Sequence, residues 1–298
     1  MKFANPIVDG YYADPEARIY DGKYVIYVTR SFTRYEDQMN LEAFTSTDLE
    51  NWEKHEGIID MNDFPYIWRA VWAPTEIEKN GKHYLIFASN DIQSDEAVGG
   101  LEIAVSDKPE GPFKGYLGHS LVDHFVNDAQ PIDAHLFKDD DGTIYLYWGG
   151  WRHCNVAVMN ETMDGFVTLE DGSWCKEITP PDYVEGPCML KKDGKYYFMW
   201  SAGDWTNGTY HVNYCVSDSP FGPFEKHTTI LEVQEGVAEG PGHHGYLYVE
   251  EKDQWLIAYH RRYIGDKEAG NRVLCLDKME FDGETILPVK MSTEPVEF

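Results

Sequence analysis

Apolar and polar residues alternate along short segments of this chain, and one two-part unit recurs from end to end. Each unit opens with two β-rich runs around a tight turn. Four turns carry Asp-Gly or Asn-Gly, with glycines at positions 22, 81, 142 and 194, and a fifth, degenerate copy has Asp253-Gln254. These dipeptides predict β-hairpins, because a type I′ turn needs a positive φ at both central residues. The predicted hairpins span residues 18–27, 76–87, 135–147, 189–199 and 245–259.

A second alternating run follows each hairpin and predicts the outer strands of the same unit. The turns recur every roughly 50 to 60 residues, which is the size of a four-stranded propeller blade. Long helical periodicity is absent from the sequence. We therefore predict an all-β fold, a single five-bladed β-propeller over residues 1–298. A β-sandwich of similar strand content is the alternative, but a sandwich does not require five copies of one unit.

The charge balance limits the classes of partner that the protein can bind. The 298 residues include 25 basic and 52 acidic ones, for a net charge of −27. A surface this acidic repels phosphate backbones and anionic headgroups, so we predict neither a nucleic-acid nor a membrane partner. A neutral sugar is unaffected, although solubility alone also accounts for the excess charge. Aromatic residues form 14 % of the chain, enough to fill a core and still line a cleft with rings. The oligomeric state stays open.

The cysteines and the N-terminus bear on the compartment. Five cysteines without a CxxC pair are typical of reduced, buried thiols. The first residues contain no apolar run of signal-peptide length, and no stretch has the length and apolarity of a transmembrane helix. We therefore predict a cytoplasmic protein, although a secreted chain trimmed of its signal would look the same.

Candidate chemistry lies at the start of each predicted hairpin. The innermost strand of every propeller blade points one end at the central funnel, so equivalent repeat positions converge there. Singly, an Asp or Glu in such a context is usually a turn or cap residue. Three carboxylates in one funnel would repel each other and lose solvation, a cost that shifted pKa values for catalysis would explain. The segments lie eight or nine residues before the turn glycines, with a fifth at the matching place: Tyr12-Ala-Asp14-Pro15, Trp72-Ala-Pro74, Ile132-Asp133-Ala134, Val184-Glu185-Gly186-Pro187 and Gly242-His243-His244.

In this order, and together with Asn5-Pro6 and Gly240-Pro241, these motifs resemble glycoside hydrolase family 43 across essentially the whole chain. The resemblance implies an inverting glycosidase. Asp14 would be the general base that activates a water, and Glu185 the general acid that protonates the leaving oxygen. Asp133 would raise the pKa of the acid and hold it in position. Inversion requires a water-sized gap between base and acid, on the order of 6.5–9.5 Å.

The resemblance also implies supporting roles, each with a plainer alternative. Trp72 would stack on the sugar, or be a core tryptophan. Arg272 would bind sugar hydroxyls, or form a surface salt bridge. His243 matches a central histidine that contacts a hydrated calcium or another ion, although it could equally be a core or turn histidine. Phe32, at the end of the first hairpin, is a further candidate for the pocket wall. No cofactor is required for the chemistry.

The predicted function is an exo-acting α-L-arabinofuranosidase that acts on oligosaccharides from arabinan or arabinoxylan. The chain ends shortly after the fifth blade, whereas many β-xylosidases of this family carry an added C-terminal β-sandwich. A β-xylosidase, or an enzyme with both activities, is the nearest alternative, with a xylose-containing oligosaccharide as its substrate. An endo-arabinanase and a galactofuranosidase come next. A non-catalytic sugar-binding propeller would not need three funnel carboxylates. The retaining invertase-type propellers carry an Asn-Asp-Pro-Asn motif that is absent around Asp14.

Overall fold

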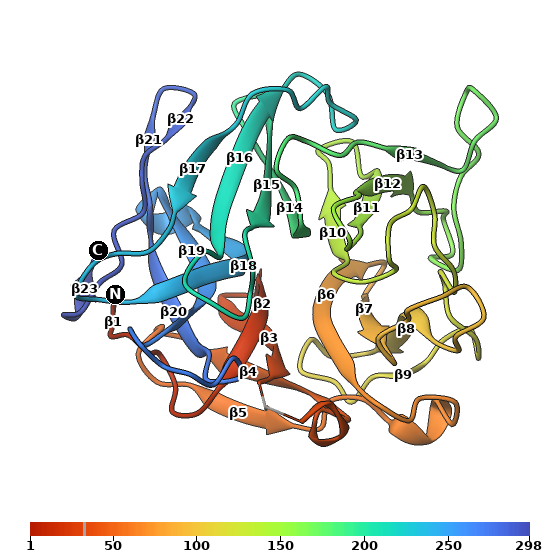
Figure 1. Cartoon of the computed structure of the whole chain (residues 1–298), viewed down its shortest axis with the longest axis horizontal. Coiled ribbons are helices and arrows are strands. Elements are labelled where there is room, and N and C mark those ends of the chain that lie inside the picture. The colour runs from red at the N-terminus through yellow and green to blue at the C-terminus, as the bar shows by residue number, and fades with distance from the viewer. Residues whose placement is uncertain (32–33) are drawn as a thin grey trace.

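The computed structural model describes residues 1–31 and 34–298, and this part of the chain is strand and loop apart from three short 3-10 helices. Five antiparallel sheets stand around a central axis and form a five-bladed β-propeller (Figure 1). The 3-10 helices are η1 (Tyr35–Asp37), η2 (Met61–Asp63) and η3 (Glu250–Lys252). None of the described helices is long and apolar enough to cross a lipid bilayer.

Each blade begins at the axis and is built outward in chain order. The first two blades are β2 (Tyr12–Tyr20), β3 (Lys23–Arg30), β4 (Leu41–Ser46), β5 (Glu53–Glu56) and β6 (Val71–Lys79), β7 (Lys82–Ser89), β8 (Gly100–Ser106), β9 (Lys114–Gly115). The next two are β10 (His135–Lys138), β11 (Ile144–Trp148), β12 (Asn155–Val158), β13 (Cys175–Glu177) and β14 (Glu185–Lys192), β15 (Lys195–Ala202), β16 (His211–Ser217), β17 (Thr228–Leu231). The fifth has three strands, which are β18 (Glu239–Val249), β19 (Gln254–Arg262) and β20 (Val273–Met279).

The hairpin turns have the predicted type I′ conformation in three of the five blades. The Asp-Gly or Asn-Gly pairs at 21–22, 80–81 and 193–194 have positive φ at both residues, as a type I′ turn requires. In the third blade only Gly142 has a positive φ, and a wider loop joins Lys138 to Ile144. The two-residue turn predicted there is wrong, because the Asp139 amide bonds the Thr143 carbonyl across a longer loop. In the fifth blade η3 and a left-handed Asp253 make the turn.

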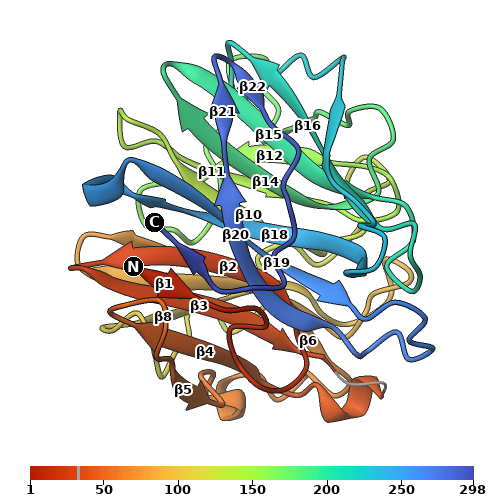
Figure 2. The same cartoon turned by 90° about the vertical axis from the view of Figure 1, so that its left-hand side faces the viewer.

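The N-terminal segment closes the ring by bonding to the edge of the fifth blade. The Ile7 amide donates to the Leu274 carbonyl at 3.0 Å. The side chain of Asn5 accepts from the Leu276 amide at 2.9 Å and donates to the Leu276 carbonyl at 2.6 Å. Strand β1 (Lys2–Phe3) pairs with β23 (Val296–Glu297), which brings the two termini together (Figure 2). A further hairpin, β21 (Phe281–Asp282) and β22 (Thr285–Ile286), follows the last blade strand.

The apolar core lies between the blades. In the described residues, five clusters of buried apolar side chains each combine residues from two neighbouring blades. The cluster between the third and fourth blades, for example, contains Tyr147, Phe198 and Trp200, all fully buried. Burying both faces of every sheet in this way excludes water from the ring except near its axis.

Four of the five inner strands carry an extra residue near their start. In the first blade Ala13 pairs with Thr29, but the next paired residue is Glu16, opposite Tyr27. The same one-residue shift interrupts β6 and β14 once and β18 twice, whereas β10 pairs with β11 without a shift. Such bulges redirect side chains and increase local twist. Each of these four strands has a bulge that contains a residue with positive φ, namely Asp14, Ala73, Gly186 or His243, and Asp133, just before β10, has a positive φ as well.

We predict that removing the Asn5 side chain loosens the ring closure. Asn5→Ala leaves the Leu276 backbone groups without these partners, and the free energy of unfolding should fall by about 1–3 kcal/mol. Urea unfolding followed by tryptophan fluorescence measures it. Asp9→Ala is the matched control, because Asp9 is exposed in the same segment. Equal stability of the two variants would show that Asn5 does not hold the ring closed.

Candidate active site

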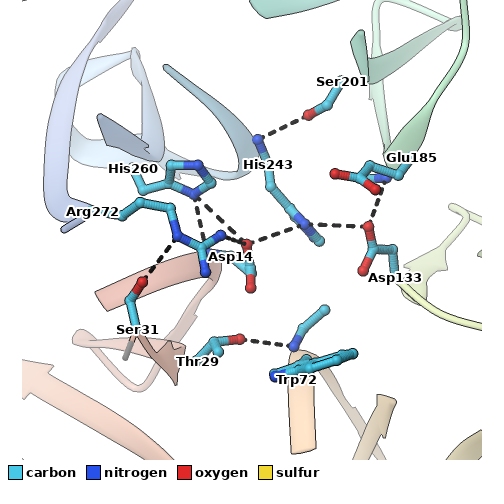
Figure 3. Close-up of polar contacts among 12 residues, drawn as sticks. Asp14, Thr29, Ser31, Trp72, Asp133, Glu185, Ser201, His243, His260 and Arg272 are labelled. Carbon is cyan, nitrogen blue, oxygen red and sulfur yellow. Dashed lines mark hydrogen bonds and ion pairs between the residues drawn. The ribbon is translucent and has the colours of Figure 1, made fainter. Parts of the chain in front are cut away.

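A cavity of about 300 Å³ opens where the inner strands begin, at the bulged end of the ring. All three predicted carboxylates line this cavity, and they come from the first, third and fourth blades. Figure 3 shows Asp14 and Asp133 on either side of His243, with Glu185 beside Asp133. The lining residues are Asp14, Tyr35, Gln38, Trp72, Asp91, Gln93, Gln130, Ile132, Asp133, Trp151, Glu185, Trp205, His243 and Arg272.

Asp14 is a buried carboxylate surrounded by nitrogen atoms. Its Oδ1 accepts a hydrogen bond from Arg272 Nη1 at 3.2 Å and lies 3.4 Å from His243 Nδ1 and 3.7 Å from His260 Nδ1. Burial by itself would raise the pKa of Asp14, but above all the charge of Arg272 brings it below its ordinary value. Asp14 is therefore ionised at neutral pH and can accept a proton.

Asp133 and Glu185, in contrast to Asp14, are carboxyl groups whose pKa is raised. Burial, and then the charge of Asp14, hold the pKa of Asp133 well above its usual range. Burial, and then the charge of Asp133, raise the pKa of Glu185 to about 7. The Gly186 amide donates to Asp133 Oδ2 at 3.1 Å, which ties the two residues together through the backbone next to Glu185. Because each carboxyl opposes ionisation of the other, the pair retains a proton near neutral pH.

The stacked rings of Tyr210 and His260 connect Glu185 with Asp14. The Tyr210 hydroxyl donates to Glu185 Oε1 at 2.8 Å. The same ring stacks on His260, with centroids 5.8 Å apart and planes 9° apart. The Asp14 amide in turn donates to His260 Nδ1 at 3.3 Å. Burial, and then the charge of Arg272, lower the pKa of His260 well below its ordinary value, so this imidazole is neutral and suited to accept that bond. A Cβ at Gly242 would lie 2.2 Å from the Tyr210 ring, so only glycine fits behind it.

Trp72 forms a half-buried wall of the cavity. Its indole Nε1 donates to the Gln38 side chain, and the edge of the Tyr35 ring meets it with centroids 4.8 Å apart. The Arg69 guanidinium covers the outer face of Tyr35 at 4.9 Å. The indole is thus held in one orientation with a face toward the carboxylates, as a sugar platform requires.

His243 lies between the two aspartates, with Nδ1 3.4 Å from Asp14 Oδ1 and 3.5 Å from Asp133 Oδ2. Calcium takes six to eight oxygen ligands. Among the described residues, no group of three or more His, Cys, Asp or Glu side chains is placed to hold a metal ion. The residues around His243 therefore do not fit a calcium ion bound directly by side chains.

The structure brings together six of the seven predicted site residues. Asp14, Asp133, Glu185, Trp72, His243 and Arg272 all line the cavity. Arg272 is buried, so the surface salt bridge considered as its alternative is wrong. Its Nε donates to the Ser31 hydroxyl at 2.9 Å, its Nη1 donates to Asp14, and a contact with sugar stays a prediction. Phe32 lies outside the described residues.

Sequence reasoning missed the residues that reach the cavity from loops. Tyr35, Gln38, Asp91, Trp151 and Trp205 all follow the second strand of a blade. An antiparallel hairpin returns the end of its second strand to the start of the first, so these loops lie beside the inner-strand bulges. The repeat could have marked the loops as a group. Their different lengths hide which residue in each loop points inward.

Comparison with known proteins places this geometry in a family. The model of the family described as "Glycosyl hydrolases family 43" matches residues 3–286. A beta-D-galactofuranosidase of Aspergillus niger is 40% identical over 99% of this chain and 87% of its own length. A beta-xylosidase of Xylanibacter ruminicola is 30% identical over 95% of this chain and 98% of its own length.

Solved structures agree on the architecture. A thermostable family-43 glycoside hydrolase has a TM-score of 0.81 at 24% identity and covers 98% of this chain and 96% of its own. An alpha-L-arabinofuranosidase from Clostridium thermocellum has a TM-score of 0.77 at 27% identity, covering 96% of both chains.

We predict that Tyr210 tunes the proton affinity of Glu185. Its hydrogen bond favours the charged carboxylate, so Tyr210→Phe should move the Glu185 pKa upward from about 7, by about one unit. Infrared titration, with Glu185→Gln spectra subtracted to isolate the carboxyl band, measures the midpoint. Tyr248→Phe is the control, because Tyr248 is exposed and bonds Asp253 instead. A midpoint that stays or falls in Tyr210→Phe would contradict this role.

Proposed function

The chain belongs to glycosyl hydrolases family 43, and we propose that it is an inverting, exo-acting α-L-arabinofuranosidase. One observation carries the mechanism. A single cavity holds a carboxyl with lowered pKa, Asp14, and a carboxyl with pKa raised to about 7, Glu185. Two titratable groups whose environments separate their pKa values in this way are suited to act as base and acid.

In the proposed reaction, the Asp14 carboxylate takes a proton from a water that attacks the anomeric carbon. Glu185 gives its proton to the glycosidic oxygen as the bond to the leaving group breaks. The new hydroxyl forms on the face opposite the leaving group, so the anomeric configuration inverts. Asp133 favours protonation of Glu185 before the step. Afterwards Asp14 releases its proton to solvent and Glu185 takes one up. The protein supplies both groups, and the chemistry needs no cofactor.

The size of the cavity supports action at a chain end. About 300 Å³ is at the lower limit of ligand pockets, which favours one terminal sugar over a long internal stretch. The substrate class is an oligosaccharide that ends in arabinose, with xylose-terminated oligosaccharides as the alternative. An ion beside His243 remains a proposal: it would have to be held through water, and calorimetric titration with calcium chloride tests it.

A β-D-galactofuranosidase is the second candidate, supported by the relative that is 40% identical over 99% of this chain. The two candidates are chemically close. α-L-Arabinofuranose and β-D-galactofuranose share the configuration of the ring and differ by one CHOH unit in the exocyclic tail. A pocket that fits one ring fits the other if there is space for the longer tail.

A panel of nitrophenyl glycosides separates these candidates. We expect turnover of the α-L-arabinofuranoside, with the β-D-galactofuranoside as the nearest competitor and the β-D-xyloside third. Proton NMR of the first product anomer should show inversion. Retention of configuration would overturn the mechanism, and preference for another glycoside would replace the proposed sugar.

We predict that Asp14→Asn and Glu185→Gln each lower kcat on natural oligosaccharides by roughly 10²–10⁴-fold while the fold is retained. Glu185→Gln should spare nitrophenyl glycosides more, because a nitrophenolate leaves with little protonation, whereas Asp14→Asn should affect both substrates alike. Circular dichroism checks the fold. Equal losses on the two substrates in Glu185→Gln would contradict its role as the acid.

A further inference from the structure

We propose that Trp151 is the platform for the leaving group, the part of the substrate beyond the scissile bond; this rests on the proposed function. Trp151 lines the cavity, yet half of its surface (50%) is exposed. An indole that is open to solvent at the mouth of a polar cavity offers a face on which a second sugar ring can stack.

The backbone around Trp151 is strained. Trp151 and Arg152 have φ of 55° and 70°, a left-handed conformation that non-glycine residues avoid. Two successive residues in this region persist only where the surrounding structure imposes them, and such strain concentrates at ligand sites. The strain turns the loop after β11 so that the indole stands at the cavity instead of continuing the strand.

The surroundings hold this loop rigid. A Cβ at Gly149 would lie 2.1 Å from the His153 carbonyl oxygen, so the loop is tightly closed on itself. The Phe125 ring supports the indole, with centroids 4.8 Å apart. A platform fixed before binding loses little conformational entropy when substrate arrives.

The position of the loop assigns Trp151 to the side of the acid. The Arg152 amide donates to the Val184 carbonyl at 3.2 Å, and the Tyr183 hydroxyl donates to the Gly149 carbonyl at 2.6 Å. Both contacts are made to the segment that leads directly into Glu185. The acid protonates the leaving oxygen, so the leaving group must lie on its side of the cavity.

The other two tryptophans of the cavity, Trp205 and Trp72, already contact polar or charged side chains of the protein. Trp205 has the Arg272 guanidinium over its ring at 5.1 Å, and Arg272 binds Asp14, the base. Trp72 is fixed by Gln38 and Tyr35. The indole of Trp151 forms no hydrogen bond among the described residues, which leaves its exposed face to the substrate.

The test separates the two halves of the substrate. Two probes are used. The first is the nitrophenyl glycoside that the panel identifies, and its aromatic ring takes the place of the leaving group. The second is the free sugar of the same glycoside, which fills only the glycone side. For Trp151→Ala we expect KM for the glycoside to rise about tenfold, with kcat changed much less, and the inhibition constant of the free sugar to stay unchanged. Trp151→Phe should restore most of the affinity. Trp68→Ala is the control, because Trp68 is 65% exposed and lies outside the cavity lining.

A parallel change in the inhibition constant of the free sugar would overturn the proposal, because it would assign Trp151 to the glycone side. An unchanged KM would overturn it as well. If the wild-type protein hydrolyses no glycoside of the panel, the proposed function fails, but calorimetry with the same nitrophenyl glycosides still decides the role of Trp151. Tighter binding by wild type than by Trp151→Ala supports the platform, and equal binding overturns it.

Discussion

A residue with positive φ, in or just before each inner strand, sets the direction of the functional side chains. Five strands crowd around the axis, and four of them leave their regular pairing at a residue with positive φ. Asp14 and His243 lie in a bulge, and Asp133 lies just before β10. Trp72 and Glu185 each stand one residue before the positive-φ residue of their bulge. A non-glycine residue in this conformation costs on the order of 1–2 kcal/mol, which the packing between blades must offset. The funnel chemistry therefore depends on a core that lies elsewhere.

The backbone near the start of the inner strands brings the three carboxyl groups together. The side chains around each carboxyl group then give it a different pKa. Asp14 faces Arg272 and two imidazoles, so ionisation is favoured there in spite of burial. At Asp133 and Glu185, burial and the repulsion between carboxylates outweigh the nearby positive charge, so a proton stays on the pair. Tyr210 and His260 join the two sides as one stacked unit that contacts both Glu185 and Asp14. The distinction between base and acid thus arises from the side chains around three chemically similar groups.

The carboxylates of the cavity and most of the side chains of its wall come from different parts of each blade. Residues in or just before the inner strands supply the carboxylates and Trp72, and loops after the second strands supply Tyr35, Trp151 and Trp205. Relatives named galactofuranosidase and beta-xylosidase match nearly the whole chain at 40% and 30% identity. One framework therefore accompanies different sugars in the family. The loops are where differences in sugar preference can arise without disturbing the carboxyls.

The sequence by itself determined the five hairpins, their order and the three carboxylates, because turn chemistry and alternation act between neighbouring residues and repeat in every blade. It misjudged the third turn, where a wider loop replaced the two-residue turn. Only the tertiary structure decided that Asn5 closes the ring, that Arg272 is buried against Asp14, and that Tyr210 reaches Glu185. These contacts join residues far apart in the chain, 258 positions in the case of Asp14 and Arg272. No local pattern encodes them, because they form only when the blades pack around a common axis.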